Sequence, residues 1–231
     1  MTYDVYIGDR MFSSWSLRGW LMLEKFNLPY RAHLVGLYAG TMAADLAHLA
    51  PARTVPAMQT PAGHVLTDSI AMAETLVEAH PNLPLYPQDP AARALARSLV
   101  AEMHSGFGAL RAECPMQLAA CWAGFSPSDA VSADLDRIDL LWGHARQNFG
   151  GHGPWFFGDY TLADAFYAPV AMRIIGYGLP VSEISQEYVQ AHLNDPAINA
   201  WRADALTVDY DPTPYALNLP QTPWPSDTGH R

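Results

Sequence analysis

The sequence Ser-Ser-Trp-Ser-Leu-Arg at residues 13–18 follows a short apolar segment, residues 3–7, and leads into a stretch of helical periodicity, residues 15–26. The apolar segment predicts a buried strand, and the i, i+4 spacing of Leu17 and Leu21 predicts a helix. The three serines therefore stand at a helix N-terminus, where unpaired N–H groups and the helix dipole stabilise an anion. N-capping explains one serine, but three in four positions cannot all cap.

The chain up to residue 80 continues to alternate between strand and helix patterns. The expected elements are a strand at 30–35, a short helix at 41–49, short strands at 57–59 and 64–66, and a helix at 69–79. A helical crossover predicts that the first two strands are parallel, and the short turn predicts that the last two form a hairpin. Residues 1–80 are thus expected to form a four-stranded βαβββα domain.

A proline-rich segment at residues 81–90 separates this domain from a helical region. Its prolines recur every third residue, which disfavours both helix and sheet and predicts an interdomain linker. The region that follows, 91–231, is expected to be an all-helical domain with a proline-rich tail that drapes over the surface. Its expected helices span 91 to about 120, 128–149, 162–175, 183–193 and 196–205.

The composition excludes several classes of function. Thirteen basic against 23 acidic residues give a net charge of -10, so no basic surface is expected for nucleic acid, although one or two arginines could still hold a small acidic ligand. The sequence shows neither a signal peptide nor a membrane-length apolar run, which predicts a cytoplasmic protein. Cys114 and Cys121 lack metal-ligand spacing, so reduced buried thiols and no metal site are expected.

Two further motifs accompany the serines. Val55-Pro56 immediately precedes the third expected strand, and Asp68-Ser69 begins the helix that follows the fourth. Each motif alone is an ordinary turn or helix cap. Their order along a βαβββα unit is the informative feature.

Together with Ser13 and Ser14, these motifs resemble the cytosolic glutathione transferase family over about residues 1–205. The stretch at 13–18 is similar to the Ser-Ser-Cys-Ser-Trp-Arg run of zeta-class enzymes, which act as glutathione transferases and maleylacetoacetate isomerases. Trp15 stands where the zeta class has cysteine. The resemblance implies an α+β glutathione transferase fold, with a thioredoxin-like N-terminal domain and an all-α second domain, that assembles as a homodimer.

The resemblance also implies how the first motif would bind glutathione, the expected co-substrate. Ser13 would hydrogen-bond the glutathione sulfur, with Ser14 as the alternative partner. Arg18 would order the loop or the carboxylates of the ligand. A hydroxyl donor at a helix N-terminus favours the thiolate, so no metal is required.

The other two motifs would hold the peptide part of glutathione. The backbone of Val55, ahead of a cis-Pro56, would bind the cysteinyl moiety, and Asp68 with Ser69 would hold the γ-glutamyl end. The electrophile would enter between the domains, where residues 103–107 of the helical region, in particular His104 and Phe107, are the expected lining.

A third motif, in the helical region, is structural. The sequence Gly-Asp-Tyr-Thr-Leu-Ala-Asp at 158–164 matches the N-capping box of the family, in which Thr161 caps the helix and the Asp164 carboxylate reaches back to the Thr161 N–H. The accompanying hydrophobic staple is weak, because Tyr160 faces only Ala165.

The sequence predicts a glutathione transferase that attacks a small hydrophobic electrophile. One alternative keeps the glutathione site but makes the protein an isomerase or dehalogenase of a small organic acid, although Trp15 in place of the zeta cysteine disfavours the isomerase. A second alternative is a non-catalytic protein-interaction module of the same fold. The joint presence of the sulfur and γ-glutamyl motifs favours the enzyme.

Overall fold

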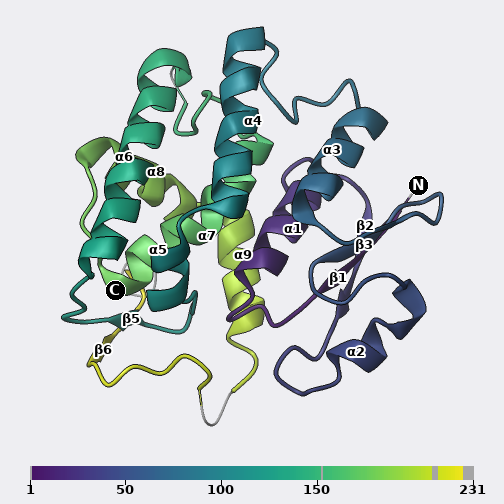
Figure 1. Cartoon of the computed structure of the whole chain (residues 1–231), viewed down its shortest axis with the longest axis horizontal. Helices are drawn as coiled ribbons and strands as arrows, with labels where there is room; N and C mark the ends of the chain where they lie inside the picture. The colour runs from purple at the N-terminus through teal and green to yellow at the C-terminus, as the bar shows by residue number, and fades with distance from the viewer. Residues whose placement is uncertain (1, 152, 210–212, 226–231) are drawn as a thin grey trace.

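The N-terminal part of the computed structural model is a four-stranded sheet with the order β2-β1-β3-β4 (Figure 1). The structure describes residues 2–151, 153–209 and 213–225. Strand β1 (Tyr3–Ile7) pairs in parallel with β2 (Tyr30–Leu34), β3 (Ala57–Gln59) runs antiparallel to β1, and β4 (Val65–Leu66) runs antiparallel to β3. The predicted parallel pair and hairpin are both confirmed.

The helices of this domain follow from local signals. Helix α1 (Ser14–Glu24) ends just before Asn27, which has a positive φ of 52°, and α3 (Ser69–Ala79) begins after its Asp68 cap, as predicted. The helix expected at 41–49 is instead two short pieces, α2 (Met42–Asp45) and the 3₁₀ helix η1 (Ala47–Leu49).

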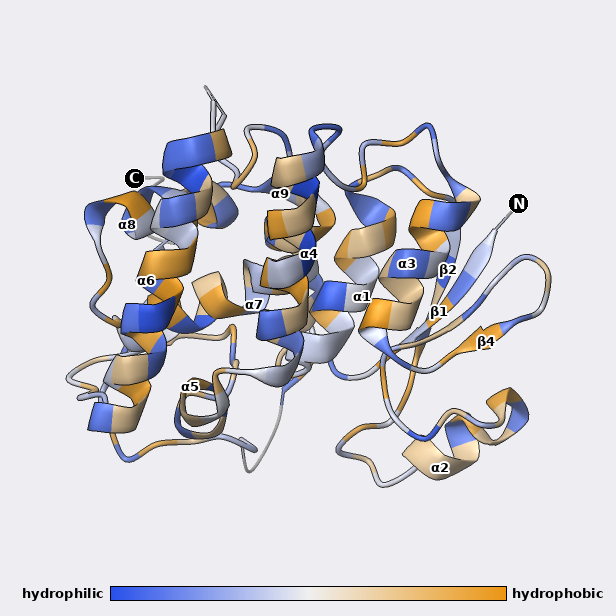
Figure 2. Cartoon of the chain, turned by 45° about the horizontal axis from the view of Figure 1, so that its top comes forward, coloured by the Kyte–Doolittle hydropathy of each residue, from blue (hydrophilic) through white to orange (hydrophobic). Residues whose placement is uncertain are grey.

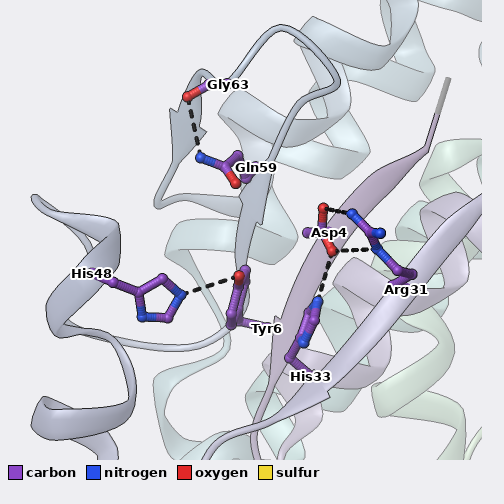
Figure 3. Close-up of polar contacts among 7 residues, drawn as sticks. All are labelled: Asp4, Tyr6, Arg31, His33, His48, Gln59 and Gly63. Atoms are coloured by element: carbon purple, nitrogen blue, oxygen red, sulfur yellow. Dashed lines mark hydrogen bonds and ion pairs between the residues drawn. The ribbon is translucent and has the colours of Figure 1, made fainter.

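The outer strand β2 presents polar side chains at the sheet edge (Figure 3). Arg31 donates two hydrogen bonds to the Asp4 carboxylate, of 2.8 and 2.7 Å, and His33 Nε2 lies 2.7 Å from the same group. The contact with Arg31 is the main reason that the pKa of Asp4 is lowered to about 2. Charged groups on an edge strand disfavour pairing with further strands, so this cluster has a structural role.

The second half of the chain is helical. Its helices are α4 (Pro90–Ser105), α5 (Gly108–Glu113), α6 (Asp129–Phe149), α7 (Leu162–Tyr177), α8 (Glu183–Leu193) and α9 (Pro196–Ala205). Hydrophilic and hydrophobic residues alternate along α4 and α6 (Figure 2), of which only part is buried, whereas nearly every residue of α7 is buried. In the described part of the chain, no helix has both the length and the apolar character needed to cross a bilayer.

The single helix predicted at 91 to about 120 is wrong. It stops at Ser105, because Phe107 adopts a left-handed conformation with a φ of 56° and redirects the chain into the short α5. Beyond α5, a non-helical stretch leads to strand β5 (Cys121–Trp122). Both cysteines are buried and free of disulfides, as expected.

The described part of the tail lies mostly at the surface, as predicted, but it also contributes a strand and a buried side chain. Strand β6 (Gln221–Thr222) pairs with β5, and the indole of Trp224 is 1% exposed. The predicted tail at 210–212 and 226–231 lies outside the described residues. The tail therefore adds one strand, paired with β5, and a core residue to the helical domain.

The two halves of the chain pack against each other along α1 and α7. Lys25, after α1, forms an ion pair with Asp195 at the start of α9, and the indole N–H of Trp201 donates to the Arg10 carbonyl at 2.9 Å. The proline-rich segment is also anchored, because Leu85 is buried and its carbonyl accepts from the Leu162 N–H. These contacts fix the two halves of the chain against each other.

Candidate functional site

A cleft of about 900 Å³ lies between the N-terminal domain and the helical domain. Its N-terminal wall comes from the start of α1, the turn before β3 and the start of α3, and its other wall from α4, α5 and α7. The structure brings most of the predicted site residues to this cleft: Ser13, Ser14, Val55, Pro56, Asp68, Ser69 and His104.

Ser13 serves as the N-cap of α1. Its Oγ accepts from the Ser16 N–H at 3.3 Å and donates to the Ser16 Oγ at 2.8 Å. The Ser16 Oγ in turn accepts from the Gly8 N–H at 2.9 Å, so it links the end of β1 to the helix. Ser13 is 6% exposed, and its hydroxyl is engaged by both the N–H and the Oγ of Ser16.

Ser14 occupies the first position of α1 and is only half-buried. Its Oγ accepts a 3.2 Å hydrogen bond from Nη2 of Arg173, which comes from α7 on the opposite wall. Among the described residues, no acceptor is found for the hydroxyl hydrogen of Ser14. Ser14 therefore offers an O–H donor to the cleft, beside a guanidinium group and a helix N-terminus.

Arg173 is buried and fixed by backbone carbonyls. Its Nε donates to the Cys114 carbonyl at 2.9 Å, and its Nη1 donates to the Pro169 carbonyl at 3.2 Å. Burial lowers the pKa of Arg173 to about 10, which leaves the group protonated at neutral pH. A positive charge thus stays next to Ser14 under ordinary conditions.

The Val55–Pro56 peptide bond is cis, as the sequence resemblance implies. Pro56 packs so closely on α1 that a Cβ at Gly19 would lie 2.8 Å from the proline ring, which explains the glycine within the helix. Val55 and Pro56 both line the cleft directly before β3.

Asp68 and Ser69 begin α3 and meet His104 from α4. Oδ1 of Asp68 caps the helix by accepting from the Ile70 N–H at 2.7 Å, while Oδ2 lies 3.3 Å from Nε2 of His104. The Ser69 hydroxyl lies 3.3 Å from Nδ1 of the same ring. His104 is thus beside the polar end of the cleft.

Two predicted site residues lie outside the cleft lining. Arg18 is buried between the rings of Trp15 and Phe166, at 4.3 and 4.6 Å, and its Nε and Nη1 have no hydrogen-bond partner among the described residues. Burial lowers its pKa to about 9. Phe107 turns away from the cleft and packs near Tyr167, because its left-handed backbone redirects the chain there.

The sequence interpretation missed two arginines of the helical wall, Arg111 and Arg173. Arg111 stacks over Trp15 at 4.9 Å and donates to backbone carbonyls, and neither arginine forms an ion pair with a described carboxylate. A signal for Arg173 existed, because it is the one charged residue in the otherwise apolar stretch 165–177. Arg111 carried no comparable signal.

Aromatic residues border the other end of the cleft. The hydroxyl of Tyr38 donates to that of Tyr215 at 2.7 Å, and the ring of Phe12 packs edge-on against both. Tyr215 belongs to the C-terminal tail, so the tail contributes to the cleft.

The predicted capping box of α7 is present outside the cleft. The Asp164 carboxylate accepts from the N–H of Thr161 at 2.8 Å and from its hydroxyl at 2.9 Å. The same carboxylate also accepts from the Phe156 N–H and the Tyr188 hydroxyl. These contacts tie the start of α7 to the preceding loop and to α8.

Comparisons with known proteins agree with this geometry. The family described as glutathione S-transferase, N-terminal domain, matches residues 12–79. A probable maleylacetoacetate isomerase of Caenorhabditis elegans is 30% identical over 177 residues, which cover 75% of this chain and 79% of the relative.

Two solved structures illustrate the likeness in fold. The maleylacetoacetate isomerase of Anaeromyxobacter dehalogenans, with glutathione bound in its active site, is 26% identical, with a TM-score of 0.62 over 88% of this chain and 96% of that one. A diazinon-metabolizing glutathione S-transferase of Bombyx mori is 20% identical, with a TM-score of 0.69 over 90% of this chain and 98% of that one.

Proposed function

Because the chain belongs to the glutathione S-transferase family and is similar to its zeta class, we propose that the cleft binds glutathione and that Ser14 holds the glutathione sulfur as a thiolate. The observation that carries the proposal is the contact between Ser14 and Arg173, which puts a hydroxyl donor, a cation and a helix N-terminus together. Ser13 keeps its capping role.

The other two motifs of the N-terminal wall supply the rest of the glutathione site. The γ-glutamyl end lies at Asp68 and Ser69, where a carboxylate receives the ammonium and a helix N-terminus receives the carboxylate. The cysteinyl backbone pairs with Val55, which directs the thiol towards the start of α1.

The environment of Ser14 favours ionisation of the thiol. A free thiol has a pKa of about 8.5, and a charge-assisted hydrogen bond together with a helix N-terminus contributes roughly 1.5–3 kcal/mol. At about 1.4 kcal/mol per pKa unit, this lowers the pKa by about one to two units. The thiol proton leaves to solvent. The thiolate sulfur then forms a bond to a small hydrophobic electrophile, which expels its leaving group or, at an activated double bond, takes up a proton.

The helical wall favours an electrophile that carries a carboxylate. Arg111 and Arg173 face the cleft without a described carboxylate partner, and Met116 and Pro115 add apolar surface beside them. This supports a second candidate function, in which glutathione assists the isomerisation or dehalogenation of a small organic acid. The first candidate, conjugation of glutathione to a small hydrophobic electrophile, uses the same thiolate. The two candidates differ in the electrophile and in whether the glutathione adduct is the final product.

The test is a titration of the purified protein with glutathione, in which the ultraviolet absorbance of the thiolate is followed against pH. A lowered thiol pKa in the parent protein that is lost in Ser14→Ala supports the proposal. Binding without a lowered pKa contradicts the role of Ser14, and no binding favours the protein-interaction module.

Product analysis with a haloacid and with an uncharged aromatic electrophile separates the two reactions. Sedimentation tests the expected homodimer, and cell fractionation tests the cytoplasmic location.

A further inference from the structure

His104 has two polar partners, and both belong to the expected γ-glutamyl site. Its Nε2 lies 3.3 Å from Asp68 Oδ2 and its Nδ1 lies 3.3 Å from the Ser69 hydroxyl. The histidine comes from the last turn of α4, whereas its partners begin α3, and these two helices pack side by side (Figure 1). One side chain of the helical domain therefore spans both polar groups of the N-terminal half-site.

The chemistry of the partners indicates which tautomer of the neutral ring satisfies both contacts. A carboxylate only accepts hydrogen bonds, so Nε2 carries the proton that faces Asp68. In the neutral ring Nδ1 is then an acceptor, which receives the hydroxyl hydrogen of Ser69. Ser69 is 2% exposed, so its hydroxyl needs such a partner. The neutral Nε2–H tautomer of His104 satisfies both groups at once.

The Asp68 carboxylate is consequently held at both oxygens. Oδ1 is engaged by the N–H groups of Ile70 and Ala71, at 2.7 and 3.4 Å, and Oδ2 faces His104. A carboxylate oxygen has room for a second donor, and the Asp68 side chain is 49% exposed, so an ammonium group can still reach Oδ2 from the cleft. His104 thus orients the carboxylate without covering it.

The imidazole packs against Trp15. The ring of Trp15 meets it edge-on, with 5.3 Å between the ring centroids, whereas Arg111 binds only the backbone carbonyl of His104, at 3.4 Å. The contact with Trp15 restricts rotation of the ring that faces Asp68 and Ser69.

We infer that His104 is a positioning residue for the γ-glutamyl end of glutathione, which orients Asp68 and Ser69 from the opposite domain. This inference rests on the proposed binding of glutathione in the cleft. It assigns His104 to the glutathione side of the cleft, whereas the sequence interpretation placed it in the electrophile pocket. The γ-glutamyl site then requires both domains, although all its expected ligands lie in the first.

The test compares glutathione with glutaryl-cysteinyl-glycine, which lacks only the α-ammonium group that Asp68 would receive. Calorimetry gives the dissociation constant of each peptide for the parent protein and for His104→Phe, which keeps a ring against Trp15 but loses both hydrogen bonds. His104→Gln retains a donor near the Nε2 position, and Ser105→Ala, an exposed neighbour outside the cleft lining, is the matched control.

The parent protein is expected to prefer glutathione over the glutaryl peptide. His104→Phe should weaken glutathione binding about fivefold, the size expected for a partly exposed hydrogen bond to a charged group, and should weaken glutaryl binding much less. His104→Gln should restore part of the preference, and Ser105→Ala should leave it unchanged. For His104→Phe, kcat at saturating glutathione should stay within about twofold of the parent value.

Three results would overturn the inference. If His104→Phe keeps the parent's preference for glutathione over the glutaryl peptide, His104 only ties the two helices together. If His104→Phe lowers kcat at saturating glutathione and leaves the dissociation constant unchanged, the ring acts on the electrophile. If the parent protein binds neither peptide, the proposed function fails together with the inference.

Discussion

Exchanging the two adjacent serines for alanine, one at a time, separates sulfur binding from helix capping. Ser14→Ala removes the hydroxyl that faces the cleft and leaves the α1 cap intact, whereas Ser13→Ala removes the cap and leaves Ser14 beside Arg173. The two variants lose the same atom one residue apart, so each is the control for the other.

The expected size follows from the contacts of each serine. Loss of one hydrogen bond to a thiolate costs about 1.4 kcal/mol, which raises the pKa of bound glutathione by about one unit. For a bound thiol of pKa about 7, kcat/KM for the electrophile at saturating glutathione and pH 6.5 then falls about eightfold in Ser14→Ala, and the defect disappears near pH 9, where both thiols are ionised. Ser13→Ala loses a cap worth about 1 kcal/mol, which lowers Tm by about 2–4 °C in a chain of this size.

The assay is kcat/KM against pH with a chromogenic electrophile, together with thermal unfolding of all three proteins. We expect a shifted pH profile with normal Tm for Ser14→Ala, and a normal profile with lowered Tm for Ser13→Ala. The reverse assignment, in which Ser13→Ala shifts the profile and Ser14→Ala does not, would refute the reasoning from hydroxyl contacts.

Further predictions concern charge and stability. Arg173→Met should raise the pKa of the bound thiol and weaken haloacid binding, whereas Arg111→Met should weaken haloacid binding alone. Equal pH profiles for the parent protein and Arg173→Met would contradict the effect of Arg173 on the thiol. Asp164→Ala should cost about 3 kcal/mol of unfolding free energy and lower the refolding yield, because it leaves four donors without an acceptor: two N–H groups, of Phe156 and Thr161, and two hydroxyls, of Thr161 and Tyr188. Asp159→Ala, at an exposed position of the same loop, should cost little. His192 is buried, and desolvation lowers its pKa to about 3. Its neutral form therefore contributes stability that is complete above pH 6.5 and is lost as pH falls. Denaturant unfolding should show the parent losing about 2 kcal/mol more than His192→Leu between pH 7.5 and pH 5.

The elements that could be predicted from the sequence are those whose signals are local. The α3 helix was predicted over its full length, because Asp68 caps its start and its apolar residues recur at helical spacing. The parallel pairing of β1 with β2 and the hairpin of β3 and β4 followed from connection lengths, whereas the pairing of β1 with β3 that completes the sheet order was not predicted. Ser13, Ser14, Asp68 and Ser69 reached one cleft because strand ends and helix starts meet at one edge of this sheet.

The remaining features depend on contacts between distant parts of the chain. No local pattern indicated that Phe107 would adopt a left-handed conformation and end a long helix, or that residues 221–222 would pair with residues 121–122. Arg18, near the start of the first helix, was expected to order the loop or the ligand carboxylates, yet helical geometry turns it towards Phe166 of α7. Which face of a helix meets another domain cannot be deduced from the first domain alone.

The contact between Ser14 and Arg173 joins residues 159 positions apart, and it explains why an arginine is found in the most apolar helix of the chain. Burying a guanidinium group is costly unless carbonyls or an anion compensate it. The carbonyls of Cys114 and Pro169 compensate two of its nitrogens, while Nη2 is directed to the start of α1. For structure alone, an apolar residue would serve at least as well at this position. The arginine is therefore best explained by an anion bound at the cleft, and the thiolate and a carboxylate electrophile are the two anions that the proposed chemistry supplies.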